Sequence, residues 1–539
     1  MVNIIKKHWP LIIALGVLWV TITTLLILSI KQNQGHLVYT LDDPYIHMSI
    51  AKNFAQYGVW GITKYEFSSS SSSLLWTLLL SLNYFLFGAN EVSPFILNFI
   101  FATLIVFGTY LLLRKYTSRA VFTLTVLLSI IFFTPLAPIV FCGQEHTMHA
   151  YFTILSVYLS AKILSDEKST TSKEYILLLI LLPLVTMARY EGLFLVFVIC
   201  ILFILRRKLL HSLCLGGVGI LPIVIYGTIS ILNGWYFLPN PVLLKGNMPD
   251  FSSLKGVIRS LGYSIYQQML GNPHILFLVI AALIVFIFHY SMEKRIWKED
   301  RIMILIFIAT TLLHMQFAST GWFFRYEAYL VTLGIIVIAI GMHEHLPEKF
   351  SFKIHRSLIP KYIAIALVIL IIILPFAERA GSSLKNTPQA TTNIYEQQYQ
   401  MGLFLREFYQ GDAVAANDVG AINYIADIEC LDLWGLANLE VAKLRREGSY
   451  DTQQIYNLAK QKSVKIAIVY DHWFGRYGGI PPQWIKVGEW KISNNVVCGG
   501  DTISFYAVDP LEKDNLIKNL RDFSYRLPND VVQTGEYTT

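Results

Sequence analysis

Two adjacent carboxylates, Asp42 and Asp43, follow the first long apolar segment of the chain, and His47 comes four residues after the second of them. Pro44 is expected at the first helical position, with Asp43 as the residue that caps the helix. His47 would then lie one turn from Asp43 on the same side. Because a cap needs only one carboxylate, Asp42 could act as a general base, or Asp43 if the cap assignment is wrong. In the plainer interpretation, Asp43 only caps and Asp42 is solvated.

The residues that follow predict the helix itself. Ile46, Ile50 and Phe54 form an apolar stripe at four-residue spacing, and Gly58 is a helix-ending residue. The pattern predicts an amphipathic helix that lies on the outer surface of a membrane.

A second polar cluster stands in the sequence GQEHTMH, where a later apolar segment begins. Glu145, together with His146 and His149, could bind a divalent metal ion, although the spacing is not that of a metalloprotease. The alternative is a carboxylate at a helix start, which the helix dipole favours. Gln144 stands directly before this group.

Charged residues also interrupt two later apolar regions. Arg189 and Glu191 divide an apolar hairpin, and ionisable groups at membrane depth usually face a cavity or pair with each other. A purely structural ion pair is therefore the alternative. Arg325 and Glu327 stand at the start of a helix on either side of Tyr326. A fixed guanidinium there suits an anionic ligand such as a phosphate.

The segment GWYFLPNPVLLKG, with Asn240 and Lys245, is a weaker version of the same pattern. Together these groups predict a cavity in which an alcohol displaces a phosphate leaving group. The expected phosphate-binding residues are Arg325, Lys245 and Arg189. The residues expected to bind the acceptor or to position groups are His47, Gln144, Glu145, His146, Glu191, Tyr326, Glu327 and Asn240.

The composition indicates a polytopic membrane protein. Of 539 residues, 54% are hydrophobic and only 15% are charged, and the mean hydropathy is +0.51. The net charge of +7 is small for this length. The sequence contains no patch of basic and aromatic residues of the kind that binds nucleic acids.

The five cysteines do not form a disulfide pattern, although Cys430 and Cys498 could pair outside the cell. Lys6 and Lys7 precede an apolar segment, which predicts an uncleaved helix with its N-terminus inside.

The loops between the apolar runs predict the topology. About twelve runs are long enough to consider, and the Lys and Arg residues cluster in five loops. All five loops can be cytoplasmic only if one early run does not cross the membrane, and the short run at 74–88 is the best candidate for an interfacial or re-entrant segment. About eleven crossings then leave residues 1–378 as a membrane module and 379–539 as an extracytoplasmic α/β domain that ends in a frayed polar tail after residue 520. The polar stretches then lie outside: 31–93, 139–148, the region of Arg189, 233–272 and 319–326.

The sequence resembles the GT-C class of polytopic glycosyltransferases, which use polyprenyl-phosphate sugars, and most of all the bacterial branch that includes terminal arabinofuranosyltransferases. The resemblance extends over about residues 40–440 and rests on these motifs: LDDPYIHMSIAKNFAQYGVWGI, SSSSSLLWTLLL, GQEHTMHA, ARYEG, FLPNPVLLKG, GWFFRYEAYL and NDVGAINYIADIECLDLWGLAN. The class carries an acidic catalytic residue in its first outer loop, which implies Asp42 or Asp43. Two departures are Gln144, where the family has Met, and Tyr190, where it has Pro.

The resemblance implies transfer of a sugar, such as the pentose arabinofuranose, from a polyprenyl phosphate to a glycan, lipid or protein acceptor at the bacterial inner membrane. In the outer domain, Asp418 and Asp432 could contact an acceptor glycan, although a structural role at turns and strand ends explains them better. The competing functions are a transporter or flippase for a lipid-linked sugar, which would favour inverted repeats and broken helices, and a scaffold without turnover.

Overall fold

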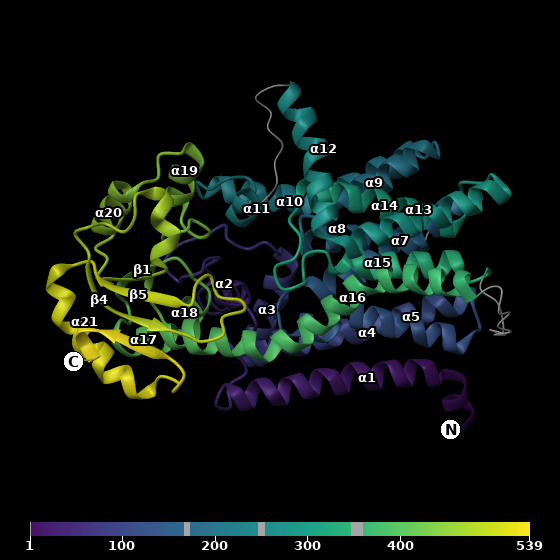
Figure 1. The fold of residues 1–539 in the computed structure, drawn as a ribbon. Helices are drawn as coiled ribbons and strands as arrows, with labels where there is room; N and C mark the ends of the chain where they lie inside the picture. Colours follow the sequence, from purple (N-terminus) through teal and green to yellow (C-terminus); the bar gives the residue numbers. More distant parts are fainter. Residues whose placement is uncertain (1, 167–172, 246–253, 346–358, 539) are drawn as a thin grey trace.

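The computed structural model describes residues 2–166, 173–245, 254–345 and 359–538. Figure 1 shows long helices side by side at one end of the molecule and a smaller domain with a β-sheet at the other. In the described residues, six helices have the length and apolar composition of membrane spans: α1 (Val2–Gln32), α4 (Val92–Tyr116), α10 (Leu209–Leu232), α13 (Pro273–Glu293), α14 (Glu299–Phe317) and α16 (Ile359–Ile394). Four shorter apolar helices are α3 (Leu74–Phe87), α5 (Ala120–Phe133), α9 (Gly192–Leu205) and α15 (Ala328–Met342). The protein is therefore a helical membrane protein with six to ten apolar helices.

The helical part has an apolar core and an apolar outer surface. Ile154, Leu182 and Phe307 are buried in one continuous core, whereas Leu221 and Ile287 are more than half exposed. Helices that are apolar on all sides suit a lipid environment. The other helices of this part are α2 (Asp43–Tyr57), α6 (Leu136–Val140), α7 (His146–Ser165), α8 (Lys173–Ala188), α11 (Asn240–Lys245) and α12 (Leu254–Gly271).

Helix α2 begins one residue earlier than the sequence analysis predicts. Asp43 is its first residue and Pro44 its second, and Asp42 precedes the helix without a side-chain cap. The assignment of Asp43 as the cap is therefore wrong. The helix ends as predicted at Gly58, which has a φ of 70° and adopts a left-handed conformation without steric cost.

The apolar stripe of α2 packs against protein and not against a membrane surface. Ile46 and Ile50 are buried in the core of the C-terminal domain, together with Phe404 and Ile422, while Phe54 is partly exposed. The expectation that this stripe contacts a membrane surface is therefore wrong for Ile46 and Ile50. An amphipathic stripe does not specify whether lipid or a folded domain covers it.

The C-terminal domain is built on a six-stranded mixed sheet with the strand order β2-β1-β3-β5-β4-β6. The strands are β1 (Ala413–Ala416), β2 (Glu429–Asp432), β3 (Ile466–Val469), β4 (Ile485–Lys491), β5 (Thr502–Ala507) and β6 (Val532–Gly535). β1 lies parallel to β2 and β3, and β5 is antiparallel to β3. The helices of the domain are α17 (Gln400–Phe408), α18 (Ala421–Ile425), α19 (Leu439–Glu447), α20 (Thr452–Gln461) and α21 (Lys513–Phe523). The α/β nature expected of this region is therefore correct.

Residues after 520 complete this domain and do not form the frayed tail that the sequence analysis expected. β6 pairs antiparallel with β4, and Tyr537 is almost fully buried. The aromatic rings of Trp490 and Phe523 stack on each other in the same core. The burial of these few apolar residues holds the segment after residue 520 against the domain, although most residues of that segment are polar.

A continuous helix joins the two parts of the molecule. α16 passes residue 379 without a break and leads into the π-helical turn η2 (Tyr395–Tyr399) and then α17. Figure 1 shows this helix extending from the helical end to the sheet domain. The C-terminal domain is thereby attached directly to the apolar helices.

Candidate functional site

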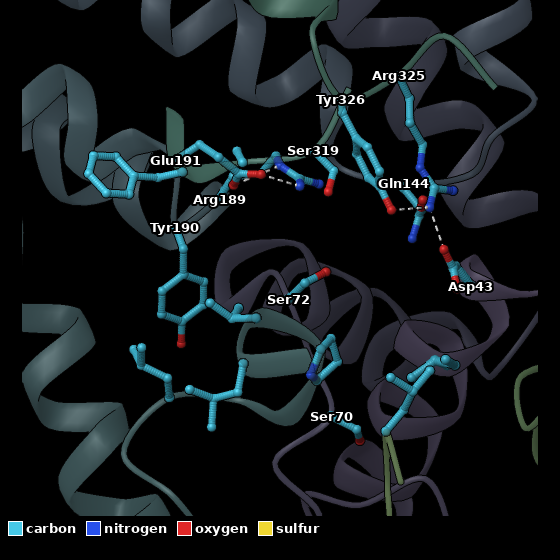
Figure 2. A pocket seen from close by; sticks show the side chains of 18 of the residues that line it. Asp43, Ser70, Ser72, Gln144, Arg189, Tyr190, Glu191, Ser319, Arg325 and Tyr326 are labelled. Carbon is cyan, nitrogen blue, oxygen red and sulfur yellow. Dashed lines mark hydrogen bonds and ion pairs between the residues drawn. The ribbon is translucent and has the colours of Figure 1, made fainter. Parts of the chain in front are cut away.

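A cavity of about 310 Å³ lies between the helical part and the C-terminal domain. Four of the five polar stretches expected on the outer side contribute charged or amide side chains to its wall, and the fifth, 233–272, contributes apolar ones. Figure 2 shows Asp43, Gln144, Arg189, Glu191 and Arg325 around the opening. The apolar side of the wall is formed by Leu193, Phe194, Val242, Leu243 and Phe317. One face of the cavity is therefore polar and charged, and the other is apolar.

Asp43 and Arg325 form an ion pair in this wall. Nη2 of Arg325 donates to Oδ2 of Asp43 and, at 3.2 Å, to the hydroxyl of Tyr326 (Figure 2). The Arg325 side chain is only 1% exposed, and its Nε and Nη1 have no hydrogen-bond partner among the described residues. Buried donors are rarely left unpaired in folded proteins. This guanidinium therefore has two N–H groups available for an anion.

Arg189, in contrast, is fully engaged by protein groups. It forms a bidentate pair with Glu191, with Nε to Oε2 at 3.1 Å and Nη2 to Oε1 at 2.6 Å. Its Nη1 lies 2.7 Å from Oε1 of Glu145 and 2.8 Å from Nε2 of His146. The two carboxylates neutralise the guanidinium, so it is less suited than Arg325 to bind a phosphate.

The same contacts argue against a metal site at Glu145 and His146. Both side chains direct a polar atom at the Arg189 guanidinium, which occupies the position where a cation would bind. In the described part of the chain, no group of three or more histidine, cysteine or acidic residues could hold a metal ion. The side chains present therefore do not fit the divalent ion that the sequence analysis considered.

His47 lies in the cavity wall beside two serines. Its Nδ1 is 3.0 Å from Oγ1 of Thr77, and its Nε2 is 3.4 Å from Oγ of Ser72 and 3.9 Å from Oε2 of Glu145. Burial lowers the pKa of His47, so the ring is neutral near pH 7. A neutral ring and the hydroxyls of Ser70 and Ser72 can hydrogen-bond a polar, uncharged ligand.

Five predicted site residues that the structure describes lie outside the cavity lining: Asp42, Glu145, His146, Asn240 and Glu327. Asp42 accepts hydrogen bonds from the backbone N–H groups of Gly420 and Ala421 at 2.7 Å each. Asn240 donates to the carbonyl of Gly435 at 2.8 Å. Lys245 ends α11, and its side chain lies outside the described residues.

Glu327, another of these residues, supports the loop that carries Arg325. Its Oε1 accepts from Arg379, and its Oε2 accepts from the backbone N–H of Gly321 at 2.7 Å. Arg379 also donates to the carbonyl of Phe324. Glu327 therefore fixes both ends of the loop and does not contact the cavity.

Sequence reasoning missed several residues of the cavity. Tyr190 lines it with a buried hydroxyl that has no partner among the described residues, and the sequence drew attention to it only as a departure from a family pattern. Ser70 and Ser72 belong to the run of six serines, which the sequence analysis used only as part of a family motif and not as a source of site residues. Arg379 does not line the cavity but supports the loop that carries Arg325, and the sequence analysis used it only as a domain boundary.

Asp418 and Asp432, the two acidic residues of the C-terminal domain that the sequence analysis singled out, have structural partners. Asp432 accepts from the backbone N–H groups of Trp434, Gly435 and Ala437 at 2.6–3.1 Å, which confirms a turn role. Asp418 accepts from Gln398 at 2.8 Å. The two cysteines of this domain, 430 and 498, are both unpaired.

Comparisons with known proteins show the fold class. Residues 392–506 match a domain of unknown function (DUF8728), and no curated protein matches the chain. The oligosaccharyltransferase of Archaeoglobus fulgidus, solved with a tethered acceptor peptide, is 12% identical, with a TM-score of 0.50 over 98% of this chain and 76% of that one. ArnT from Cupriavidus metallidurans is 13% identical, with a TM-score of 0.52 over 93% of this chain and 98% of that one. It was solved in the apo state and with undecaprenyl phosphate bound. The fold is thus similar to that of GT-C glycosyltransferases over nearly the whole chain.

Proposed function

We propose that this protein is an integral membrane glycosyltransferase that transfers a sugar from a polyprenyl-phosphate donor to a hydroxyl of a cell-envelope glycan, lipid or protein. The observation that carries the proposal is the Asp43–Arg325 pair in a cavity whose other wall is apolar. The GT-C-like fold supports transfer of lipid-linked sugars, and the undecaprenyl phosphate bound by ArnT supports a polyprenyl-phosphate ligand. A pentose such as arabinofuranose is the proposed sugar, from the sequence resemblance.

Asp43 is the proposed general base. Asp42 was preferred while Asp43 was assigned as the helix cap, but that assignment is wrong. Both carboxylate oxygens of Asp42 bind N–H groups of Gly420 and Ala421, outside the cavity lining. The Asp43 side chain is 21% exposed and faces the cavity.

The reaction then follows from the positions of these two groups. The Asp43 carboxylate accepts the proton of the acceptor hydroxyl, whose oxygen forms a bond to C1 of the donor sugar. The bond between C1 and the phosphate oxygen breaks, and the polyprenyl phosphate leaves with the electron pair. The free N–H groups of Arg325 stabilise its negative charge. No step uses a metal ion.

The remaining cavity residues bind the two substrates. The apolar wall of Leu193, Phe194 and Phe317 suits the first isoprene units of the donor. The neutral His47 and Gln144, whose Oε1 has no partner among the described residues, suit sugar hydroxyls. Arg189, with its two carboxylates, acts as a fixed wall, and Lys245 stays a proposed contact for the phosphate.

The orientation in the membrane is part of the same proposal. We place α3, with α2, in the first outer loop and propose that eleven of the described helices cross the membrane: α1, α4, α5, α7 to α10 and α13 to α16. An odd number places the termini on opposite sides, with the C-terminal domain and the cavity outside the cell. A bacterial inner membrane is the proposed location.

The test uses purified protein in nanodiscs, a panel of polyprenyl-phosphate sugars and crude envelope acceptor, and measures release of free polyprenyl phosphate. We expect release by the wild type and a loss of about 10²- to 10⁴-fold in Asp43→Asn, the usual effect of removing a general base. Asp412→Asn is the matched control, because Asp412 pairs with Lys465 on the surface of the outer domain. Donor binding without release by any protein would contradict the proposal and favour a transporter.

A further inference from the structure

Asp42, the residue directly before Asp43, joins α2 to the outer domain at Gly420 and Ala421, here called the tip of the domain. The two oxygens of Asp42 accept from the first N–H groups of α18, at Gly420 and Ala421. The backbone carbonyl of Asp42 accepts in turn from Tyr45 within the first turn of α2. One residue therefore connects the outer domain to the turn that carries Asp43.

A second contact holds the opposite end of the same short helix. Nζ of Lys52, on α2, donates to the carbonyls of Asn423 at 3.2 Å and Tyr424 at 2.6 Å. These carbonyls lie in the last turn of α18, which a cation suits. The hydroxyl of Ser49 adds a longer contact of 3.4 Å to the carbonyl of Gly420. α18 is thus fixed to α2 at both of its ends.

The contact at Gly420 has no room for a side chain. A Cβ atom built there would lie 2.1 Å from the carbonyl oxygen of Asp42 and 2.7 Å from its Oδ2. Ile46 and Ile50 of α2 are buried in the apolar core on the same side. The close approach of backbone to backbone therefore leaves α2 little freedom to move relative to the outer domain.

From these contacts we infer that the tip of the outer domain, at Gly420 and Ala421, positions the catalytic helix α2, and that Asp42 is the positioning residue through which it acts on Asp43. The inference rests on the proposed function, since it assigns Asp43 as the base. It gives the outer domain a role in turnover besides any contact with an acceptor. Displacement of a catalytic group by about 1 Å can reduce a rate about 100-fold.

The test compares Gly420→Ala and Asp42→Ala with Asp427→Ala. Asp427 pairs with Lys64 across the same two parts of the molecule, but both side chains are about a third or more exposed, and exposed ion pairs contribute little. We expect kcat to fall about 100-fold in the first two variants, as a small displacement would cause, with unchanged KM for the donor. Asp427→Ala keeps wild-type kcat. The kcat is calculated per site that binds polyprenyl phosphate, so that misfolded protein does not lower its value.

The outcomes separate this inference from the function itself. Wild-type kcat in Gly420→Ala and Asp42→Ala, with an inactive Asp43→Asn, would overturn the positioning role and leave the function standing. An Asp42→Ala protein as inactive as Asp43→Asn, beside a fully active Gly420→Ala, would make Asp42 the base and also overturn it. An active Asp43→Asn would instead contradict the proposed function.

Discussion

Asp43 and Arg325 are 282 residues apart in the sequence, and their side chains form an ion pair in the cavity wall. The pair places a carboxylate and a guanidinium with two unpaired N–H groups at one point. A base for the acceptor and a cation for the leaving group are the two charges that phosphate displacement from a sugar requires.

Replacement of Arg325 by lysine tests the phosphate contact. Lysine keeps the charge but lacks the planar fork of donors. A hydrogen bond to a charged group contributes about 1.5–3 kcal/mol, so we expect polyprenyl phosphate to bind about 10- to 100-fold more weakly. Direct binding of labelled polyprenyl phosphate in detergent measures the effect. Arg445→Lys is the control, because Arg445 stacks on Trp434 away from the cavity, and equal affinities in all three proteins would contradict the assignment.

Replacement of Tyr190 by phenylalanine separates ligand binding from folding. The Tyr190 hydroxyl is buried and has no partner among the described residues, so its removal should leave thermal stability equal or slightly higher. If a sugar hydroxyl binds there in the complex, the KM for the donor should rise about tenfold, the worth of one net hydrogen bond. Thermal unfolding measures the stability, and initial rates on the same preparation measure the KM for the donor. Reduced stability with an unchanged KM would mean that the hydroxyl has a structural partner and no substrate.

The Glu327–Arg379 pair predicts a large effect on stability. Both side chains are at most 5% exposed, and removal of one partner of a buried ion pair typically costs about 3–5 kcal/mol. We expect Arg379→Met and Glu327→Gln each to lower the unfolding temperature strongly. The double variant should lose less than the sum, because neither charge is then left unpaired. Strict additivity in thermal unfolding would show that the two residues act independently.

Asp42 predicts a dependence of stability on pH. Burial and the neighbouring Asp418 carboxylate raise the pKa of Asp42 to about 8, in spite of its two backbone donors. Between the ordinary value of about 3.9 and pH 8 the folded protein binds more protons than the unfolded one. The free energy of unfolding should therefore fall as the pH rises through this range, by up to about 1.4 kcal/mol per pH unit.

The comparison of Asp42→Asn with the wild type isolates this contribution. Asp432, whose pKa burial raises to about 6, acts in the same direction at lower pH, so the useful range is pH 6.5 to 8.5. The unfolding temperature of the wild type should decrease more steeply there than that of the variant. Parallel curves would exclude Asp42 as the titrating group.

Much of the architecture was predictable because it depends on local composition. Long apolar runs can satisfy their backbone groups in lipid only as helices or closed barrels, so the membrane helices follow from the sequence. The strands near 414 and 466 and the helices near 400 and 452 were also recognisable from their periodicity. The segments at β4 to β6 were not recognised, because their polar residues hide the few aromatic residues that fix them.

The site was predictable as a set of residues but not as an arrangement. The sequence by itself determined that unusual charges stand at the ends of apolar segments, and their cost in lipid implies that they meet in a cavity or in pairs. Only the tertiary structure decided that Arg189 is neutralised by two carboxylates while Arg325 keeps free donors. It also placed the Asp42 carboxylate on two backbone N–H groups and the Asp43 carboxylate in the cavity wall, and this is why Asp43 is the proposed base. Adjacent residues at a helix start point about 100° apart, and the N–H groups that hold Asp42 come from a loop 378 residues away, a contact that no local pattern encodes.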